Sequence, residues 1–172
     1  MKKLTIATTL LLLATPVLAE TMSEKTGVNS VLGVAPTTAD FVKEAAISDM
    51  FEIQSSMLAD SISDTATKAF AERMIADHKK TTAAITAMAK APIPTAMDST
   101  HQSMLDKLKG LKGADFTKKY LDDQVTAHKE AVSLYQRYAK GGEDAGLKAF
   151  ADKTVPTLQE HLKMAQDLDK PS

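Results

Sequence analysis

Residues 70–88 have the sequence FAERMIADHKKTTAAITAM, and the spacing of the apolar side chains in this stretch decides the fold class. Positions that recur at alternating steps of four and three residues lie on one face of a helix in a bundle. Here that face contains Met74, His78, Thr81 and Ile85. A histidine thus occupies a position where leucine would pack better, so the stretch predicts a bundle helix with a polar group inside the bundle.

The same periodicity predicts four further helices. The Ser63-Asp64 turn separates the quoted helix from the one before it, and the quoted helix ends before Pro92, because the residue before a proline disfavours helix. Thr37 or Thr38 can cap the first helix. Pro156 should kink the last one. The further helices are expected at 38–62, 98–109, 114–139 and 143–168.

Two helical hairpins joined by a longer connection are typical of a four-helix bundle with a crossover. We therefore predict an all-α, ferritin-like four-helix bundle with a short extra helix in the crossover connection. Residues 20–36 contain two glycines and a proline and lack helical periodicity, which indicates a flexible linker. The bundle domain is expected to span residues 37–168.

The first 19 residues have the pattern of a secretory signal peptide. Lys2 and Lys3 precede an apolar run from Leu4 to Ala14, and cleavage is expected after Ala19. The apolar run is too short to cross a bilayer, so the mature chain is expected to have no transmembrane segment. These features predict an exported protein of the bacterial periplasm.

The composition narrows the classes of function. The chain has no cysteine, which excludes disulfides and attachment of a lipid to a cysteine. Removing residues 1–19 takes away two lysines and no acidic residue, leaving 19 basic and 22 acidic side chains, a net charge of −3. This balance argues against a nucleic-acid partner, and the sequence indicates no particular protein partner.

Each long helix places one strong metal-ligating residue among its bundle-facing positions. These residues are Glu52, His78, His128 and His161. Imidazole and carboxylate ligands suit transition metals such as zinc, iron or copper. We therefore predict one metal ion in the bundle core.

Two observations leave the ligand set open. A second apolar stripe, Ile47, Phe51 and Leu58, would turn Glu52 towards the edge of the bundle. At about 1.5 Å per residue, His161 is expected one to two turns away from the level of the other candidates. Asp77 and Glu160 adjoin two of the histidines and are expected at the surface or behind the ligands.

Other functions remain open. The histidines could instead be hydrogen-bonded to Glu52 or Tyr135 in a metal-free network, as in a non-catalytic structural, interaction or stress-response protein. An enzyme that uses the metal with an open coordination position is a third reading. Met97, His101 and Met104 share one face of the short helix and could bind copper, although methionine more often fills gaps.

Several stretches resemble a known family, the domain of unknown function 4142. They are FAERMIADH (70–78), FTKKYLDDQVTAH (116–128) and PTLQEH (156–161). The resemblance implies an exported bacterial protein, of a group often labelled outer-membrane proteins, with a ferritin-like fold, and it implies no particular activity. The chain departs from the Glu-x-x-His pattern of di-iron bundles, because Ile75, Val125 and Leu158 stand three residues before the histidines. A mononuclear site is therefore expected.

Overall fold

The computed structural model of the chain describes residues 28–62, 64–90 and 92–170. The signal peptide predicted at residues 1–19 lies outside this range. The described residues form helices and contain no strand. The helices are α2 (Val28–Leu32), α3 (Thr38–Ile62), α4 (Thr65–Met88), α5 (Ser99–Lys109), α6 (Gly113–Gly141) and α7 (Ala145–Leu168).

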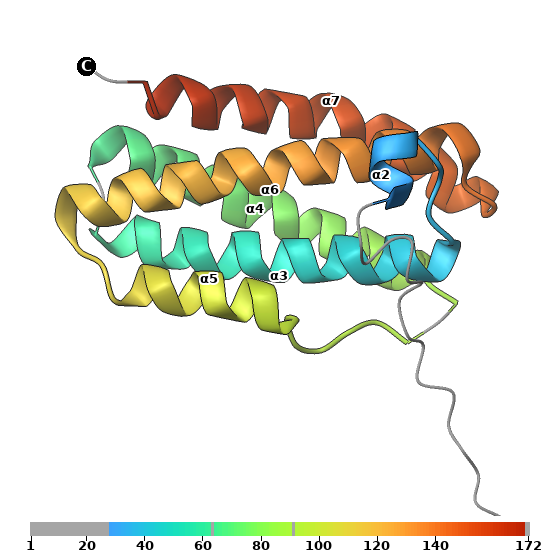
Figure 1. The fold of residues 1–172 in the computed structure, drawn as a ribbon, viewed down its shortest axis with the longest axis horizontal. Coiled ribbons are helices and arrows are strands. Elements are labelled where there is room, and N and C mark those ends of the chain that lie inside the picture. The colour runs from blue at the N-terminus through green and yellow to red at the C-terminus, as the bar shows by residue number, and fades with distance from the viewer. Residues whose placement is uncertain (1–27, 63, 91, 171–172) are drawn as a thin grey trace, which may run out of the picture.

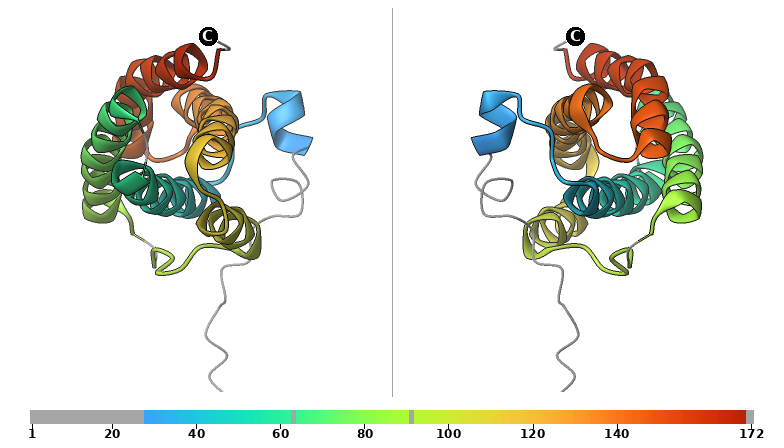
Figure 2. Two further views of the ribbon diagram at one scale, coloured as in Figure 1. Left: turned by 90° about the vertical axis from the view of Figure 1, so that its left-hand side faces the viewer. Right: turned by 90° about the vertical axis from the view of Figure 1, so that its right-hand side faces the viewer.

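The four long helices form an antiparallel bundle. α3 and α4 make one hairpin, and α6 and α7 make the other (Figure 1). Viewed end-on, the helices follow the order α3, α4, α7, α6 around a common centre, and α5 lies outside them next to α3 (Figure 2). The connection through α5 returns the chain to the end of the bundle where α4 begins. The predicted all-α, ferritin-like bundle with a crossover helix is confirmed.

Side-chain caps explain where the first hairpin helices begin. The Thr37 hydroxyl accepts a hydrogen bond from the backbone N–H of Asp40 at 3.1 Å. The Asp64 carboxylate accepts from the backbone N–H groups of Ala66 and Thr67, each at 3.0 Å. All three bonds satisfy donors that have no partner inside the helix. The structure thus confirms the predicted helix 38–62, and a new helix begins directly after Asp64.

The segment before α3 contains more structure than the sequence predicts. A linker was expected throughout 20–36, yet α2 forms a short helix within it. The segment also contacts the bundle: the hydroxyls of Ser30 and Ser133 lie 3.2 Å apart, and the Arg137 guanidinium donates to the Val34 carbonyl at 2.8 Å. These polar contacts with α6 tie residues 30–34 to the bundle, a tertiary effect that local periodicity does not reveal.

The second hairpin contains a proline and a close turn. α7 continues through Pro156, which has no N–H to donate to the carbonyl of Asp152, and both residues are exposed. The predicted kink at this residue stays a prediction. Gly142, which follows α6, has an ordinary φ of −62°. A Cβ atom there would lie 2.6 Å from the Tyr138 carbonyl oxygen, so close approach requires the glycine.

α3 is apolar on two faces because it has neighbours on two sides. Phe51 is fully buried and belongs to a cluster with Leu105 and Leu108 of α5. Glu52, one position further along the helix, is also 0% exposed. The extra helix thus covers the second apolar stripe and leaves the first facing the bundle centre. The alternative that Glu52 lies at the edge of the bundle is excluded.

Two apolar clusters fill the bundle, one towards each end. The cluster towards the α3–α4 turn includes Phe70, Met74 and Phe116, and the cluster at the opposite end includes Phe41, Ile85 and Leu147. Buried polar residues lie between them along all four long helices. They include Asp49, Glu52, His78, His128 and His161. The fold therefore holds a polar layer between two apolar ones.

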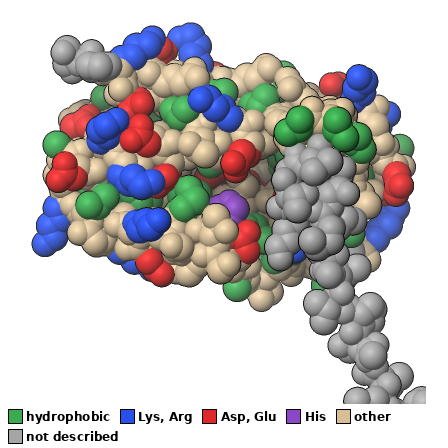
Figure 3. Space-filling model, viewed as in Figure 1, with side chains coloured by type: hydrophobic (Ala, Val, Ile, Leu, Met, Phe, Trp, Pro, Cys, Tyr) green, Lys and Arg blue, Asp and Glu red, His purple; other side chains and the backbone are tan. Residues whose placement is uncertain are grey.

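The surface of the bundle is mostly polar. On the face shown in Figure 3, acidic and basic side chains are interspersed, and hydrophobic side chains gather over α2. The exposed large hydrophobic residues include Val31, Leu32 and Val34 of this segment. Among the helices that the structure describes, none is long and apolar enough to cross a membrane.

The Asp64 cap gives a test of the first hairpin. Replacing Asp64 by Ala should lower the free energy of unfolding by about 1 kcal/mol, because two backbone N–H groups lose their acceptor. Asp64→Asn keeps an acceptor and should lose much less. Urea denaturation of the three proteins measures both effects. Equal losses in the two variants would show that the carboxylate charge, and not the cap, provides the stability.

Candidate metal centre

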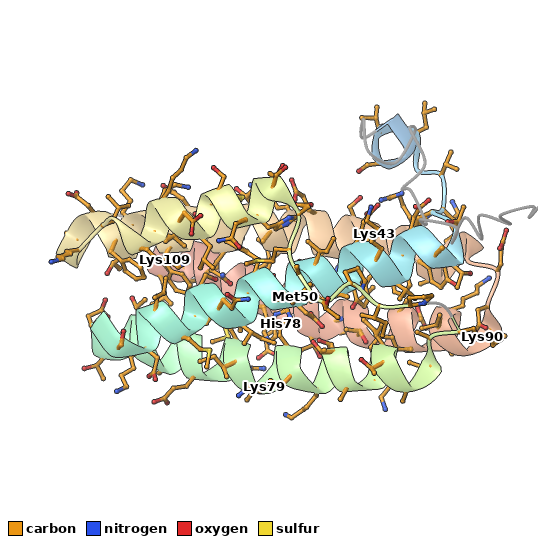
Figure 4. The ribbon with its side chains drawn as sticks, turned by 90° about the horizontal axis from the view of Figure 1, so that it is seen from below. Lys43, Met50, His78, Lys79, Lys90 and Lys109 are labelled. Atoms are coloured by element: carbon orange, nitrogen blue, oxygen red, sulfur yellow. The ribbon has the colours of Figure 1, made fainter. Side chains whose placement is uncertain are left out.

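Three histidines from three helices meet in the polar layer. The ring centroids of His78 and His128 lie 5.5 Å apart, as do those of His78 and His161, and His128 and His161 are 5.4 Å apart. One nitrogen from each ring lies within 4.8 Å of the other two. All three side chains are nearly inaccessible, with exposures of 2%, 0% and 1%. Figure 4 shows His78 between α3 and α4.

The meeting of the three histidines corrects the predicted position of His161 along the axis of the bundle. That prediction counted His161 from one end of the bundle and the other residues from the opposite end, although the helices differ in length, with 29 residues in α6 and 24 in α7. Counted from the α6–α7 turn, His161 lies about 24 Å along α7 and His128 about 20 Å along α6, at about 1.5 Å per residue. The difference is less than one helical turn. The expectation that His161 is one to two turns away was wrong.

Two buried carboxylates of α3 contact the histidines. Asp49 Oδ1 lies 2.8 Å from His78 Nδ1, and Glu52 Oε2 lies 2.9 Å from the same nitrogen. Glu52 Oε1 lies 3.4 Å from His128 Nδ1. Thr81 and Thr82 each donate to Asp49 Oδ2 at 2.8 Å. The structure thus brings Glu52 to the histidines on their Nδ1 side.

Each ring has one nitrogen occupied by a protein acceptor. Besides the bond from His78 Nδ1 to Asp49, His128 Nδ1 lies 2.9 Å from the carbonyl oxygen of Gln124, and His161 Nε2 lies 3.2 Å from Asp77 Oδ2. A carbonyl or carboxylate can only accept, so these ring nitrogens donate their protons. Such bonds fix which nitrogen of a neutral imidazole keeps its lone pair.

The second nitrogen of each ring has no hydrogen-bond partner among the described residues. These atoms are His78 Nε2, His128 Nε2 and His161 Nδ1. Both carboxylate oxygens of Glu52 are buried and likewise make no bond with hydrogen-bond geometry to described residues. Unpartnered buried polar atoms are costly, and their collection in one place calls for a ligand that they share.

The charges of the layer act on one another strongly. Burial raises the pKa of Glu52, but the charges of His78 and His128 outweigh it and lower the pKa to about 2. Burial opposes charge on His78, yet Glu52 and Asp49 raise its pKa to about 10. Without a metal, therefore, a proton on His78 balances Glu52 inside the bundle.

The other two histidines resist protonation. Burial and the charges of His78 and His128 lower the pKa of His161 to about 4, against the opposing effect of Asp77. Burial and the charge of His78 also lower the pKa of His128. One proton thus excludes further protons, as expected for like charges in a low-dielectric interior.

Sequence reasoning missed Asp49. It lies three residues before Glu52, so the two carboxylates share a helix face, and this i, i+3 spacing is the signal that could have found it. Asp77, expected at the surface or behind the ligands, does contact His161. Glu160 lies at the surface and pairs with Arg73, with nitrogen–oxygen distances of 2.8 and 3.1 Å.

The methionines of the connecting segment have a packing role. Met97 and Met104 are partly buried against the apolar cluster that contains Phe51. The ring of His101 lies edge-on to Phe51 at 5.7 Å, and its Nδ1 is 2.9 Å from Asp98. These contacts agree with methionine as a gap filler under α5.

Comparisons with known proteins agree with this architecture. The family model described as "Domain of unknown function (DUF4142)" matches residues 23–168. No curated protein matches the chain. Among solved structures, "CopM in the Cu(II)-bound form" is similar, with a TM-score of 0.66, 16% identity, and coverage of 79% of this chain and 97% of CopM. At this identity the likeness shows the fold alone.

The low pKa of His161 predicts how the metal-free protein responds to acid. Its ordinary value is about 6.5 and its folded value about 4, so between these pH values the unfolded chain binds a proton that the folded protein does not. The free energy of unfolding should fall by roughly 1–3 kcal/mol from pH 7 to 4.5. The raised pKa of His78 offsets only part of this loss, because most of its stabilisation is already present at pH 7 and little is added below pH 6.

Urea denaturation at the two pH values measures the loss. His161→Gln removes the group that titrates and should reduce the dependence on pH. A free energy of unfolding that stays constant from pH 7 to 4.5 in the wild-type protein would contradict the assigned charge states.

Proposed function

The chain belongs to the DUF4142 family, and we propose that it binds one transition-metal ion in the bundle core, through His78, His128 and His161. One observation supports this assignment above all: each ring directs an unpartnered nitrogen into the same buried layer, and one nitrogen from each ring lies within 4.8 Å of the others. A cation accepts three lone pairs at once, whereas without an ion these buried nitrogens have no hydrogen-bond partner among the described residues.

The residues behind the ligands suit the same purpose. Each ring donates its other N–H to an oxygen, from Asp49, Asp77 or the Gln124 carbonyl, which orients the ring and makes the remaining nitrogen more basic. We assign Glu52 to the charge balance of the ion, since its oxygens lie beside the Nδ1 atoms of His78 and His128. Direct ligation by Glu52 stays a prediction.

The donor set narrows the choice of metal. Three imidazoles suit zinc, copper or iron, and they leave a coordination position open for water or a carboxylate. They do not suit magnesium or calcium, which prefer oxygen ligands. Since the similar CopM structure contains Cu(II), copper is the first ion to test, beside zinc.

A metal-free network is the alternative function. One observation favours it: His78 already pairs with Asp49 and Glu52, and His161 with Asp77, at 2.8–3.2 Å. In that case the polar layer would only fix how the helices align, in a structural or interaction protein. The three unpartnered ring nitrogens weigh against it, because a network selected for stability would pair them.

Metal binding can be tested on protein purified without chelator. The wild-type protein should contain close to one equivalent of zinc or copper, and His128→Ala should weaken binding by at least about 100-fold. His101→Ala, outside the layer, should bind normally. Element analysis and competition titration measure both. Wild-type protein without bound metal, or His128→Ala with normal affinity, would contradict the site.

Chelation should also destabilise the protein. A ligand present at about 100 times its dissociation constant stabilises the folded state by about 2.7 kcal/mol, so EDTA should lower the melting temperature by roughly 5–10 °C. Differential scanning calorimetry measures the shift. An unchanged melting temperature in wild-type protein would favour the metal-free network.

We further propose that the protein acts in the bacterial periplasm, after removal of residues 1–19. The basic and apolar pattern of those residues supports export. The net charge of −3 supports a function without nucleic acid. Mass spectrometry of the protein from a periplasmic extract should give a chain that begins at Glu20, and recovery of the chain with residues 1–19 in the cytoplasm would contradict export.

A further inference from the structure

The layer of histidines is closed on most sides. His78 is paired with Asp49 and Glu52, whose side chains are 4% and 1% exposed. His128 is paired with the backbone of Gln124, a residue that is 0% exposed. An ion that enters from these directions would have to cross packed helices, because the apolar clusters fill both ends of the bundle.

The partner of His161 is different, because it reaches the surface. The Asp77 side chain is 22% exposed, and its Oδ2 atom lies 3.2 Å from His161 Nε2. Asp77 belongs to α4 and His161 to α7, so this contact bridges two neighbouring long helices. A single carboxylate thus touches both the buried ring and the solvent.

Basic side chains surround the outer side of this carboxylate. Lys80 Nζ lies 2.9 Å from Asp77 Oδ1, and Arg73 Nε lies 3.5 Å from Asp77 Oδ2. Arg73 also binds Glu160 of α7 at 2.8 Å, so it links the two helices across the same place. Lys80 is 76% exposed and Arg73 39% exposed, so both can move away without disturbing the core.

We infer that metal ions reach the buried histidines between α4 and α7, with Asp77 as the first ligand they meet and with Lys80 and Arg73 restraining access. This inference rests on the proposed metal site and adds its access route. An arriving cation displaces the basic side chains from Asp77, binds the carboxylate, and then passes to the ring of His161 as that ring turns. Because the cation and the two basic groups compete for one carboxylate, their charges slow both uptake and release.

Lys79 and Lys80 offer a matched pair of substitutions. Lys80 contacts Asp77, whereas Lys79 lies on the outer side of α4 (Figure 4) and is exposed. Lys80→Gln and Lys79→Gln change the net charge equally. If only long-range charge matters, the two variants should bind metal at the same rate; if the contact restrains access, only Lys80→Gln should bind faster.

The probe is Co(II), whose visible absorption changes when imidazoles bind it. Stopped-flow mixing of Co(II) with metal-free protein gives the association rate, and a chase with EDTA gives the dissociation rate. At low salt, Lys80→Gln should associate about threefold faster than wild type and Lys79→Gln at the wild-type rate. The difference should shrink at about 0.5 M salt, where such charges are screened.

Asp77→Asn separates an access role from a merely positioning one. Asparagine keeps an oxygen that can accept from His161 but loses the charge that attracts the ion. Association should slow by about tenfold at low salt, because the arriving ion loses the charge that it meets first. Faster dissociation with unchanged association would show that Asp77 only positions His161, and would overturn the route.

Different results would contradict the metal site and the access route between α4 and α7. No Co(II) absorption in the wild-type protein at equilibrium would contradict the metal site, and the route with it. Normal equilibrium binding with equal association rates in the wild type, Lys80→Gln and Asp77→Asn would contradict the route alone. Circular dichroism of each variant confirms that these surface substitutions leave the helices intact.

Discussion

The buried contact between Glu52 and His78 is the constraint on which the centre of the bundle depends. A carboxylate that is 0% exposed is very unfavourable unless a positive charge lies beside it, and the imidazole nitrogen at 2.9 Å provides that charge. Once α3 and α4 are fixed by this pair, His128 and His161 complete the layer from α6 and α7. A proton on His78 supplies the positive charge in the metal-free protein, and the proposed metal ion would supply it in a metal-bound one.

The polar layer costs stability, and the rest of the bundle offsets that cost. Apolar clusters on both sides of the layer and α5 on the outside of α3 exclude water from Glu52 and the three rings. In this low-dielectric setting the contacts among the buried charges are strong. On the metal-binding proposal, polar residues occur where leucine would pack because they hold the ion, which a uniformly apolar bundle could not do.

Much of the fold could be predicted from the sequence, because helix boundaries depend on local signals. Helix ends are indicated directly by Thr37, Asp64 and the prolines after α4. The buried faces of the long helices follow from apolar residues at alternating steps of four and three. Local signals do not predict the parts of the structure that depend on tertiary contacts. α2 forms beside α6, and the second stripe of α3 is buried only because α5 covers it.

For the candidate site, the sequence yields the residue types and their faces but not their distances. Spacing alone identified the four candidate ligands Glu52, His78, His128 and His161. The position of His161 along the bundle axis depends on how the helix ends align, and periodicity does not encode that alignment. Asp49 was missed because the alternating steps of four and three that pass through Glu52 skip position 49. Which nitrogen of each ring is free depends on partners from other helices, and only a structure shows it.

The most direct measurement of the central claim is X-ray absorption at the metal edge of the full-length protein loaded with one equivalent of Zn(II) or Cu(II). The account predicts nitrogen ligands at about 2.0–2.1 Å for Zn(II), with the multiple scattering of three imidazoles. His78→Ala should reduce the multiple scattering to that of two imidazoles. A first shell made of oxygen atoms without imidazole scattering would contradict the assignment of the three histidines.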